Sequence, residues 1–320
     1  MKVAHPWIVL ALLAAGSAQA AGPGTGAATK TYLEYRTVLA KAGKIEEILP
    51  YLAKARRAKV EETPAEQRAR MFSFVKAMSE TVELKVVKET ATPTGAELEV
   101  HVVTGEGSDE KGTVAMVKEE GAFRVDKESF AAVEKGAAPA PTCEQVVADL
   151  KAASGVTRAR AAGAVGDPNS LLHSKCLASV PALADALSDP VRGIRDNAAR
   201  ALRNLLSGVA RKDASGLSPY RPLLPKLAAA KAAAGTASET VLEINLQAAI
   251  ASFGADAIPS LVTDLKHPGQ ELRWGAAQAL GRLGPAAAAA LPAVKAAAAA
   301  EQDEMTRDAL AAAEKAIQGQ

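Results

Sequence analysis

The stretch Val180–Leu205 reads VPALADALSDPVRGIRDNAARALRNL, and a second stretch, Ile258–Leu283, repeats its pattern as IPSLVTDLKHPGQELRWGAAQALGRL. The shared positions keep the constant offset of 78 residues that separates Pro181 from Pro259; they are Pro181, Leu183, Leu187, Pro190, Ile194, Arg195, Ala198, Ala201 and Leu202, matched by Pro259, Leu261, Leu265, Pro268, Leu272, Arg273, Ala276, Ala279 and Leu280. A unit of roughly 40 residues fits twice into that offset, which is the period of stacked two-helix repeats. Such arrays present surfaces for binding.

Weaker markers extend the array outward from these two copies. Pro225 opens a degenerate unit between them, Pro292 opens a unit after the second copy, and Thr142 is placed to cap the first helix of the array. These spacings predict about five helix pairs over residues 143–320. The proline that opens a unit sits in the first turn, where no amide donor is needed, and the second proline breaks the chain between the two helices.

Three motifs carry a resemblance to a known family. They are the Pro-x-Leu opening at Pro181, the turn at Asp189 and Pro190, and the Arg-x-x-Ala-x-x-Ala-Leu helix that starts at Arg195. With these motifs the units resemble HEAT repeats, especially the short bacterial variety shared with phycobilisome-lyase-like proteins. The resemblance implies an all-α solenoid. It does not carry the lyase activity over, since the sequence shows no chromophore-attachment chemistry. The second copy has His267 where the first has Asp189, which puts the turn hydrogen bond of that aspartate in doubt.

Composition supports a mainly helical chain. Hydrophobic residues make up 48% of the 320 residues, but aromatic residues only 3%. Alanine supplies much of the apolar content and is the best helix former, so closely packed helices are expected. The formal net charge of +2 gives no global electrostatic attraction for nucleic acid.

Residues 1–20, MKVAHPWIVLALLAAGSAQA, have the tripartite pattern of a secretory signal peptide. Lys2 provides the positive start, Ile8–Ala15 the apolar core, and the small residues Ala18 and Ala20 predict cleavage after Ala20. A membrane anchor is the alternative, but the apolar run is shorter than the ~18 residues that a span needs. We therefore expect a periplasmic or secreted protein with no membrane span after cleavage.

Between the signal and the array, the sequence predicts a mixed domain. Residues 21–29 read as a flexible leader and residues 135–142, KGAAPAPT, as a linker. Within residues 30–134, helical spacing of apolar residues changes to alternation near Val82, with turns at Thr92–Gly95 and Gly105–Gly112. Helices followed by an antiparallel meander are expected, with the helices covering the apolar face of the sheet.

The end of this meander, VKEEGAFRVDKESF at residues 117–130, carries a second resemblance. Helices followed by a meander with this ending resemble the small cone-shaped α+β domains of the cystatin-like and nuclear-transport-factor-like superfamily. Members usually have tryptophan where this chain has Phe123. The resemblance implies the α+β fold and no particular activity, because one fold hosts many functions.

Both cysteines, Cys143 and Cys176, fall in the helical region. In an oxidising compartment they can pair, and closing a loop of their separation stabilises a protein by about 3–4 kcal/mol in the chain-entropy model. Two free buried thiols are the alternative, because free cysteine packs as a small hydrophobe.

A partner surface is expected on the second helix of each unit, between its core positions. The residues placed there are Arg200, Arg203, Asn204, Trp274 and Gln278. Tryptophan and arginine are enriched in binding hot spots, and Trp274 is the only tryptophan after residue 20. Packing of Trp274 on a neighbouring repeat is the alternative. Arg195 and Arg273 are expected to tie adjacent turns together.

Catalytic and metal chemistry find little support in the sequence. His101 is the only histidine of the α+β domain and falls on the polar side of its strand beside Glu97 and Glu99. His173 and Cys176 are three residues apart, so a metal site near Cys143 is an alternative, but a disulfide uses the same cysteines more simply. Phosphate loops, nucleophile elbows and His-Glu-x-x-His motifs are missing from the sequence. We predict a non-enzymatic scaffold without cofactor or metal that binds a protein or peptide. Ligand binding or catalysis inside the α+β cone is the alternative, and a deep polar pocket there would favour it.

Overall fold

The computed structural model describes residues 24–133, 141–168, 170, 172–173, 175–236 and 239–320. The predicted signal peptide and most of the predicted linker lie outside the described residues. The chain divides into two compact units, each with its own hydrophobic core. The first comprises residues up to 79 with 84–102 and 110–133, and the second comprises 80–83, 103–109 and 134–320.

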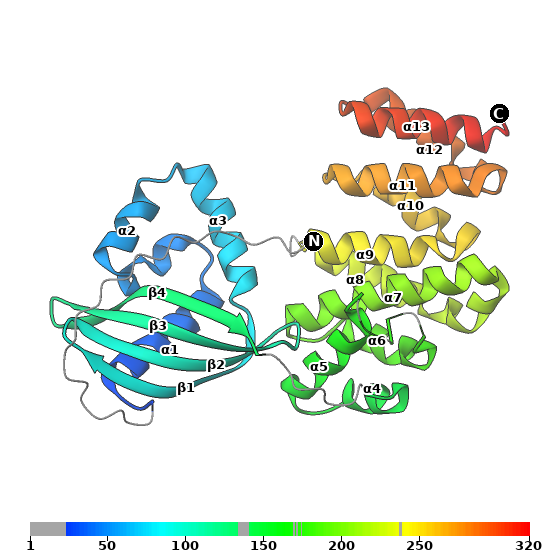
Figure 1. The fold of residues 1–320 in the computed structure, drawn as a ribbon. Coiled ribbons are helices and arrows are strands. Elements are labelled where there is room, and N and C mark those ends of the chain that lie inside the picture. Colours follow the sequence, from blue (N-terminus) through cyan, green and yellow to red (C-terminus); the bar gives the residue numbers. More distant parts are fainter. Residues whose placement is uncertain (1–23, 134–140, 169, 171, 174, 237–238) are drawn as a thin grey trace. The chain divides into compact units, whose positions relative to one another are not determined.

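The first unit begins with three helices, α1 (Ala27–Lys41), α2 (Lys54–Glu61) and α3 (Ala65–Met78). Four strands follow, β1 (Thr81–Thr92), β2 (Gly95–Thr104), β3 (Asp109–Glu119) and β4 (Ala122–Ala132), which pair in sequence order in one antiparallel sheet (Figure 1). This confirms helices followed by an antiparallel meander. The α+β composition therefore follows from the change of hydrophobic period in the sequence.

The prediction of a flexible leader up to residue 29 is wrong for its last residues. Helix α1 begins at Ala27, and Ala28 is fully buried. The backbone N–H and the hydroxyl of Thr29 both donate to the Glu89 carboxylate, at 2.9 and 2.7 Å. Glu89 thus satisfies a free amide at the start of α1, and small side chains let the helix approach the sheet closely.

Strand β4 extends to Ala132, well past Val125, where the alternation of apolar and polar residues ends. The pairing of β3 with β4 shifts between Ala115 and Met116, so that Asp126 has no partner on β3. A bulge of this kind exchanges the faces of the residues that follow it. Val125 is fully buried before the bulge, and after it Glu128 and Phe130 are half-buried between exposed neighbours. The alternation pattern did not predict this half of the strand, because the inward positions change at the bulge and one of them is occupied by a glutamate.

The second unit contains ten helices among its described residues. Written as successive pairs, they are α4 (Cys143–Asp149) with α5 (Gly155–Gly166), α6 (Val180–Ala186) with α7 (Arg192–Lys212), α8 (Leu224–Thr236) with α9 (Thr240–Ala251), α10 (Ile258–Asp264) with α11 (Gln270–Leu283), and α12 (Leu291–Ala300) with α13 (Glu304–Ile317). Short 3-10 segments precede α6, α8, α10 and α12.

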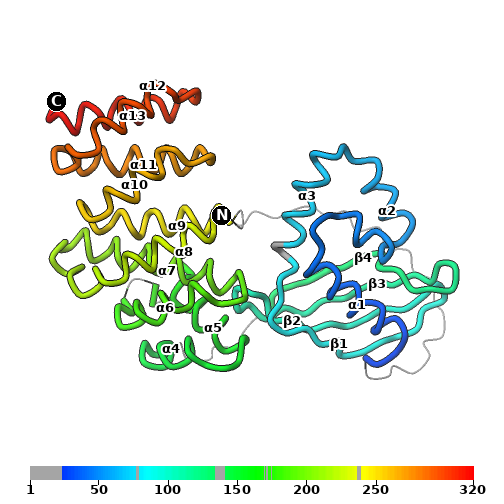
Figure 2. Tube along the Cα trace, turned by 180° about the vertical axis from the view of Figure 1, so that it is seen from behind, coloured from blue at the N-terminus to red at the C-terminus, as the bar shows by residue number. Residues whose placement is uncertain are grey.

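The odd-numbered helices of this unit pack in sequence order. Helix α5 contacts α7, α7 contacts α9, α9 contacts α11 and α11 contacts α13, as both views show (Figures 1 and 2). Ile194, Ala198 and Leu202 of α7 are fully buried, as are Ala276 and Leu280 of α11. These apolar positions of the two repeated stretches therefore face one continuous core.

Cys143 and Cys176 form a disulfide, with their Cα atoms 5.4 Å apart. The bond joins the first residue of α4 to the segment that precedes α6. Thr142 caps α4 as expected, because its hydroxyl accepts the Gln145 N–H at 3.2 Å. The pairing was open in the sequence and is present in the structure.

By length and mean hydropathy, one helical run among the described residues, Gln270–Ala300, reaches the size of a membrane span. The run is interrupted, since Gly284 has φ of 55° and Ala287 leaves the helical region. Leu280 and Val294 within it are buried in the core that the other helices share. The run therefore consists of two helices that contribute to the helical core.

Candidate functional site

The predicted surface residues of α11 are exposed. Trp274 is 39% exposed, and Gln278, one turn further along, is exposed as well. Trp274 lies next to Gly275, which packs against Gln247 of α9. An indole that is partly exposed on a rigid helix offers apolar area to a partner at a small entropic cost.

The predicted residues of α7 are half-buried and have partners within the second unit. Arg200 lies 3.9 Å from the Glu106 carboxylate. Arg203 donates to the Asn204 side-chain oxygen at 3.4 Å, and the Asn204 amide contacts His173 at 3.4 Å. The structure therefore separates the five predicted residues, and those on α11 are the more accessible.

A row of arginines occupies the fourth residue of nearly every odd-numbered helix in the second unit. Those of α5, α7, α11 and α13 are Arg158, Arg195, Arg273 and Arg307. Each donates to two carbonyls of the turn before its own helix; for Arg195 these belong to Asp189 and Pro190, at 2.7 and 3.1 Å. We call this row the arginine ladder and each position a rung.

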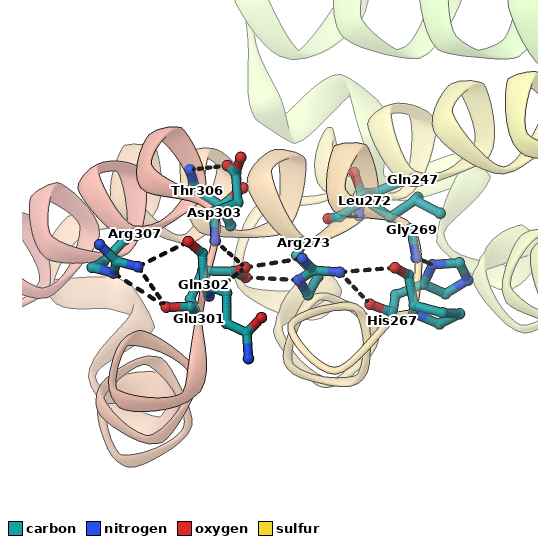
Figure 3. A network of polar contacts seen from close by, with 11 residues as sticks. Gln247, His267, Gly269, Leu272, Arg273, Glu301, Gln302, Asp303, Thr306 and Arg307 are labelled. Carbon is teal, nitrogen blue, oxygen red and sulfur yellow. Dashed lines mark hydrogen bonds and ion pairs between the residues drawn. The ribbon is translucent and has the colours of Figure 1, made fainter.

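Three of these rungs also bind a carboxylate that precedes the next odd-numbered helix. Arg158 pairs with Asp189 and Arg195 pairs with Glu239. Arg273 makes two bonds to Glu301, at 2.7 and 2.9 Å (Figure 3). The Arg273 guanidinium lowers the pKa of the Glu301 carboxyl to about 2, with help from backbone N–H groups of the same turn. The arginines thus tie adjacent turns together, as the sequence predicted for Arg195 and Arg273.

One rung has the opposite charge order. The fourth residue of α9 is Glu243. Its partner, in the turn before α11, is His267, whose Nε2 lies 3.0 Å from the Glu243 carboxylate. The His267 Nδ1 accepts the Gly269 N–H at 3.0 Å, so the ring donates to Glu243 through Nε2–H. His267 therefore replaces the turn hydrogen bond of Asp189, which the Val191 N–H donates at 2.9 Å. We call Glu243 and His267 the inverted rung.

A groove of about 740 Å³ lies beside the inverted rung. Its walls come from α8 and α10, and the buried residues Glu243 and Ile250 of α9 lie at its base. Lys231 of α8, 8% exposed, forms an ion pair with Asp264 of α10, which is 3% exposed. A buried ion pair contributes little net stability, so such a pair in a groove is a candidate for a functional role.

Further hydrogen bonds hold this buried pair in place. Lys231 also donates to the Ser260 hydroxyl at 3.0 Å. Gln247 donates to the second Asp264 oxygen and to the Leu272 carbonyl, each at 2.8 Å. The groove is therefore built on a fixed polar framework that links α8, α9, α10 and α11.

The first unit has a polar cluster within its core. Tyr32 and Tyr35 of α1 donate to the Glu128 carboxylate at 3.2 and 3.3 Å, and Arg36 and Arg56 lie at 3.9 and 3.3 Å from it. Burial, and then the Glu128 charge, raise the pKa of both tyrosines above the ordinary value of 10. The tyrosines stay neutral and act as donors, so the cluster satisfies an inward carboxylate.

His101 lies where the sequence placed it, on the face of β2 opposite Val100 and Val102. It lines a hollow of about 500 Å³ together with Glu99 and Lys111. Glu97 is exposed on the same strand. Val100 of the core and Phe130, which packs against the core, also line the hollow, and Glu99 is bound by Lys88 at 2.9 Å.

No group of three or more histidine, cysteine or acidic side chains within the described residues is placed to hold a metal. No family model matches this chain. No curated protein matches it either.

The inverted rung and the groove are two features that the sequence pattern did not predict. A signal was present: counting four residues into each second helix gives arginine in four units and glutamate in α9. The Lys231–Asp264 pair had no such signal, because its residues are 33 positions apart on two different helices.

Proposed function

We propose that this protein is an exported, non-enzymatic scaffold whose helical unit is a HEAT-type solenoid that binds a protein or peptide. The observation that carries the proposal is the arginine ladder, in which the same contact recurs from pair to pair along the odd-numbered helices. Repetition of one interface is what builds a solenoid, whose extended surface serves binding.

Five helix pairs support the solenoid proposal. In each pair a short 3-10 segment or a capping residue precedes the first helix. The second helix, from α5 to α13, carries the rung at its fourth residue. A solenoid of this kind contacts partners through side chains that are not needed for stacking. Trp274 and Gln278 meet that description on α11, and we propose that they form the contact surface.

Export is supported by the disulfide between Cys143 and Cys176. Such bonds persist in oxidising compartments and are rare in the cytosol. We propose a periplasmic or secreted location with cleavage after Ala20, and sequencing of the amino terminus of the mature protein tests it. A start at Ala21 is expected.

Affinity purification from the native envelope fraction tests the scaffold, with Trp274→Ala compared with wild type. The matched control is Phe74→Ala on α3, since Phe74 is an aromatic residue that is 67% exposed. We expect Trp274→Ala to reduce partner recovery at least tenfold and Phe74→Ala to leave it unchanged. Equal recovery from both variants would reject the proposed surface.

A further inference from the structure

The inverted rung changes the charge that this part of the helical unit presents to a ligand. At Arg158, Arg195 and Arg273 a guanidinium neutralises the carboxylate of the next turn. At Glu243 the array supplies a carboxylate instead, and its partner is the imidazole of His267, whose Nδ1 accepts a backbone N–H. Among the described residues, no lysine or arginine binds Glu243. A buried carboxylate without a lysine or arginine partner favours the approach of a cation.

One carboxylate of the groove has no arginine or lysine partner among the described residues. Glu243, Asp256 and Asp264 line the groove, but Arg221 binds Asp256 at 2.7 Å and Lys231 binds Asp264, whereas Glu243 has only the histidine of the inverted rung. The Lys231 ammonium is already held by Asp264 and Ser260. An anionic ligand would have to displace these buried bonds to reach the Lys231 ammonium. A cation could contact Glu243 without breaking them.

The remaining walls of the groove are apolar. Leu224, Pro225, Ala228 and Ala232 line it from α8 and Pro259 from α10. Such walls suit aliphatic groups, while the acidic base suits a charged end, and long basic side chains combine both features. The volume of about 740 Å³ lies within the range of sites that enclose a small ligand or a few side chains.

We propose that this groove binds a lysine or arginine side chain of a peptide segment whose neighbouring residues are apolar. The basic end lies beside Glu243, where every other rung has its own arginine, and the apolar neighbours contact Leu224 and Pro259. The inference rests on the proposed scaffold function and gives it a second contact site, separate from Trp274.

The test uses random heptapeptides displayed on phage and selected on the mature protein. Parallel selections use Ala232→Arg, which places a basic side chain in the groove, and Ala229→Arg, which makes the same change at an exposed position of α8 outside it. We expect one basic residue with apolar neighbours to be enriched on wild type and Ala229→Arg and lost on Ala232→Arg. No such enrichment on wild type, or the same enrichment on Ala232→Arg, overturns the proposal.

Titration of a selected peptide, followed by calorimetry, sharpens the test. Replacing its basic residue by glutamine, or Glu243 by glutamine in the protein, should weaken binding at least tenfold. Glu243→Gln keeps an acceptor for the His267 Nε2–H, and circular dichroism checks that it folds. Unchanged affinity in both cases contradicts the inference.

The two proposals fail in different ways. If Trp274→Ala loses the envelope partner while Ala232→Arg keeps it and the selections show no basic enrichment, the scaffold stands and the groove does not. If Trp274→Ala has no effect and the groove still selects basic peptides, the α11 surface is rejected alone.

Discussion

The rung at Arg273 and the rung at Glu243 occupy the same position in adjacent helix pairs, yet their chemistry is opposite. Arg273 closes its rung with a bidentate bond to Glu301 and two carbonyl contacts (Figure 3). Glu243 meets a single imidazole nitrogen and lies at the base of a groove. The repeat thus determines where the side chain lies, but the residue type at that position determines which contacts it makes. A departure from the repeated residue therefore marks a place where the local surface differs from that of the other helix pairs.

The largest expected effect comes from breaking the arginine rung. Arg273→Ala leaves the Glu301 carboxylate, whose side chain is 5% exposed, with backbone N–H donors alone, which should lower the free energy of unfolding by about 3–5 kcal/mol. Urea unfolding followed by circular dichroism measures it. Arg307→Ala is the control, because Arg307 is exposed and, among the described residues, its side chain donates to carbonyls alone; its loss should cost about 1 kcal/mol. Equal losses would show that the carboxylate contact adds nothing.

The disulfide provides a covalent link near the start of the array, where the first rung begins. Replacing Cys143 and Cys176 together by serine should lower the free energy of unfolding by about 3–4 kcal/mol, since the bond closes a 33-residue loop in the unfolded chain. Denaturant titration of the oxidised protein and the double variant checks it. A difference below about 1 kcal/mol contradicts the expected constraint.

Reversing the charges of the inverted rung tests whether an arginine at the position of Glu243 would form the same ion pair as the other rungs. Glu243→Arg and His267→Glu together recreate an arginine rung, while Glu243→Arg alone places two basic groups side by side. The double-mutant cycle should show a favourable coupling of about 1–2 kcal/mol between the two substitutions. The double variant should also lose peptide binding in the groove. Additive effects would mean that the two side chains act independently.

The smallest expected effect is a dependence of the unfolding midpoint on pH that comes from the arginine rung at Glu301. The pKa of Glu301 is lowered from 4.5 to about 2 in the folded protein by its bonds to Arg273. A depressed folded pKa stabilises the protein above the unfolded pKa, and this stability is lost as the pH falls from about 4.5 towards 2. The unfolding midpoint should drop in this window for wild type, and less for Glu301→Gln. Parallel pH profiles for the two proteins contradict this assignment.

The sequence predicted the elements of the helical unit because its repeated prolines, leucines and arginines report local structure and core contacts directly. It placed the change from helices to strands near Val82 for the same reason. The full length of β4 escaped prediction, since the bulge at Asp126 exchanges the faces and Glu128 occupies an inward position.

The site was harder to predict than the fold. The five predicted binding residues share a helical face by spacing alone, but spacing says nothing about whether Glu106 or His173 lies against them. The groove depends on contacts between residues of different pairs, such as Lys231 with Asp264. Such contacts follow from three-dimensional stacking and leave no periodic trace in a single sequence.

Two glycines leave room for polar side chains of α9. A Cβ atom at Gly235 would lie 2.7 Å from the Glu243 carboxylate, and one at Gly275 would lie 2.3 Å from the Gln247 side-chain oxygen. Each of these oxygens ends a flexible side chain, so an alanine at either glycine would shift that side chain and leave the backbone in place. The positions of Glu243 and Gln247 therefore depend on the absence of a side chain on the neighbouring helices α8 and α11.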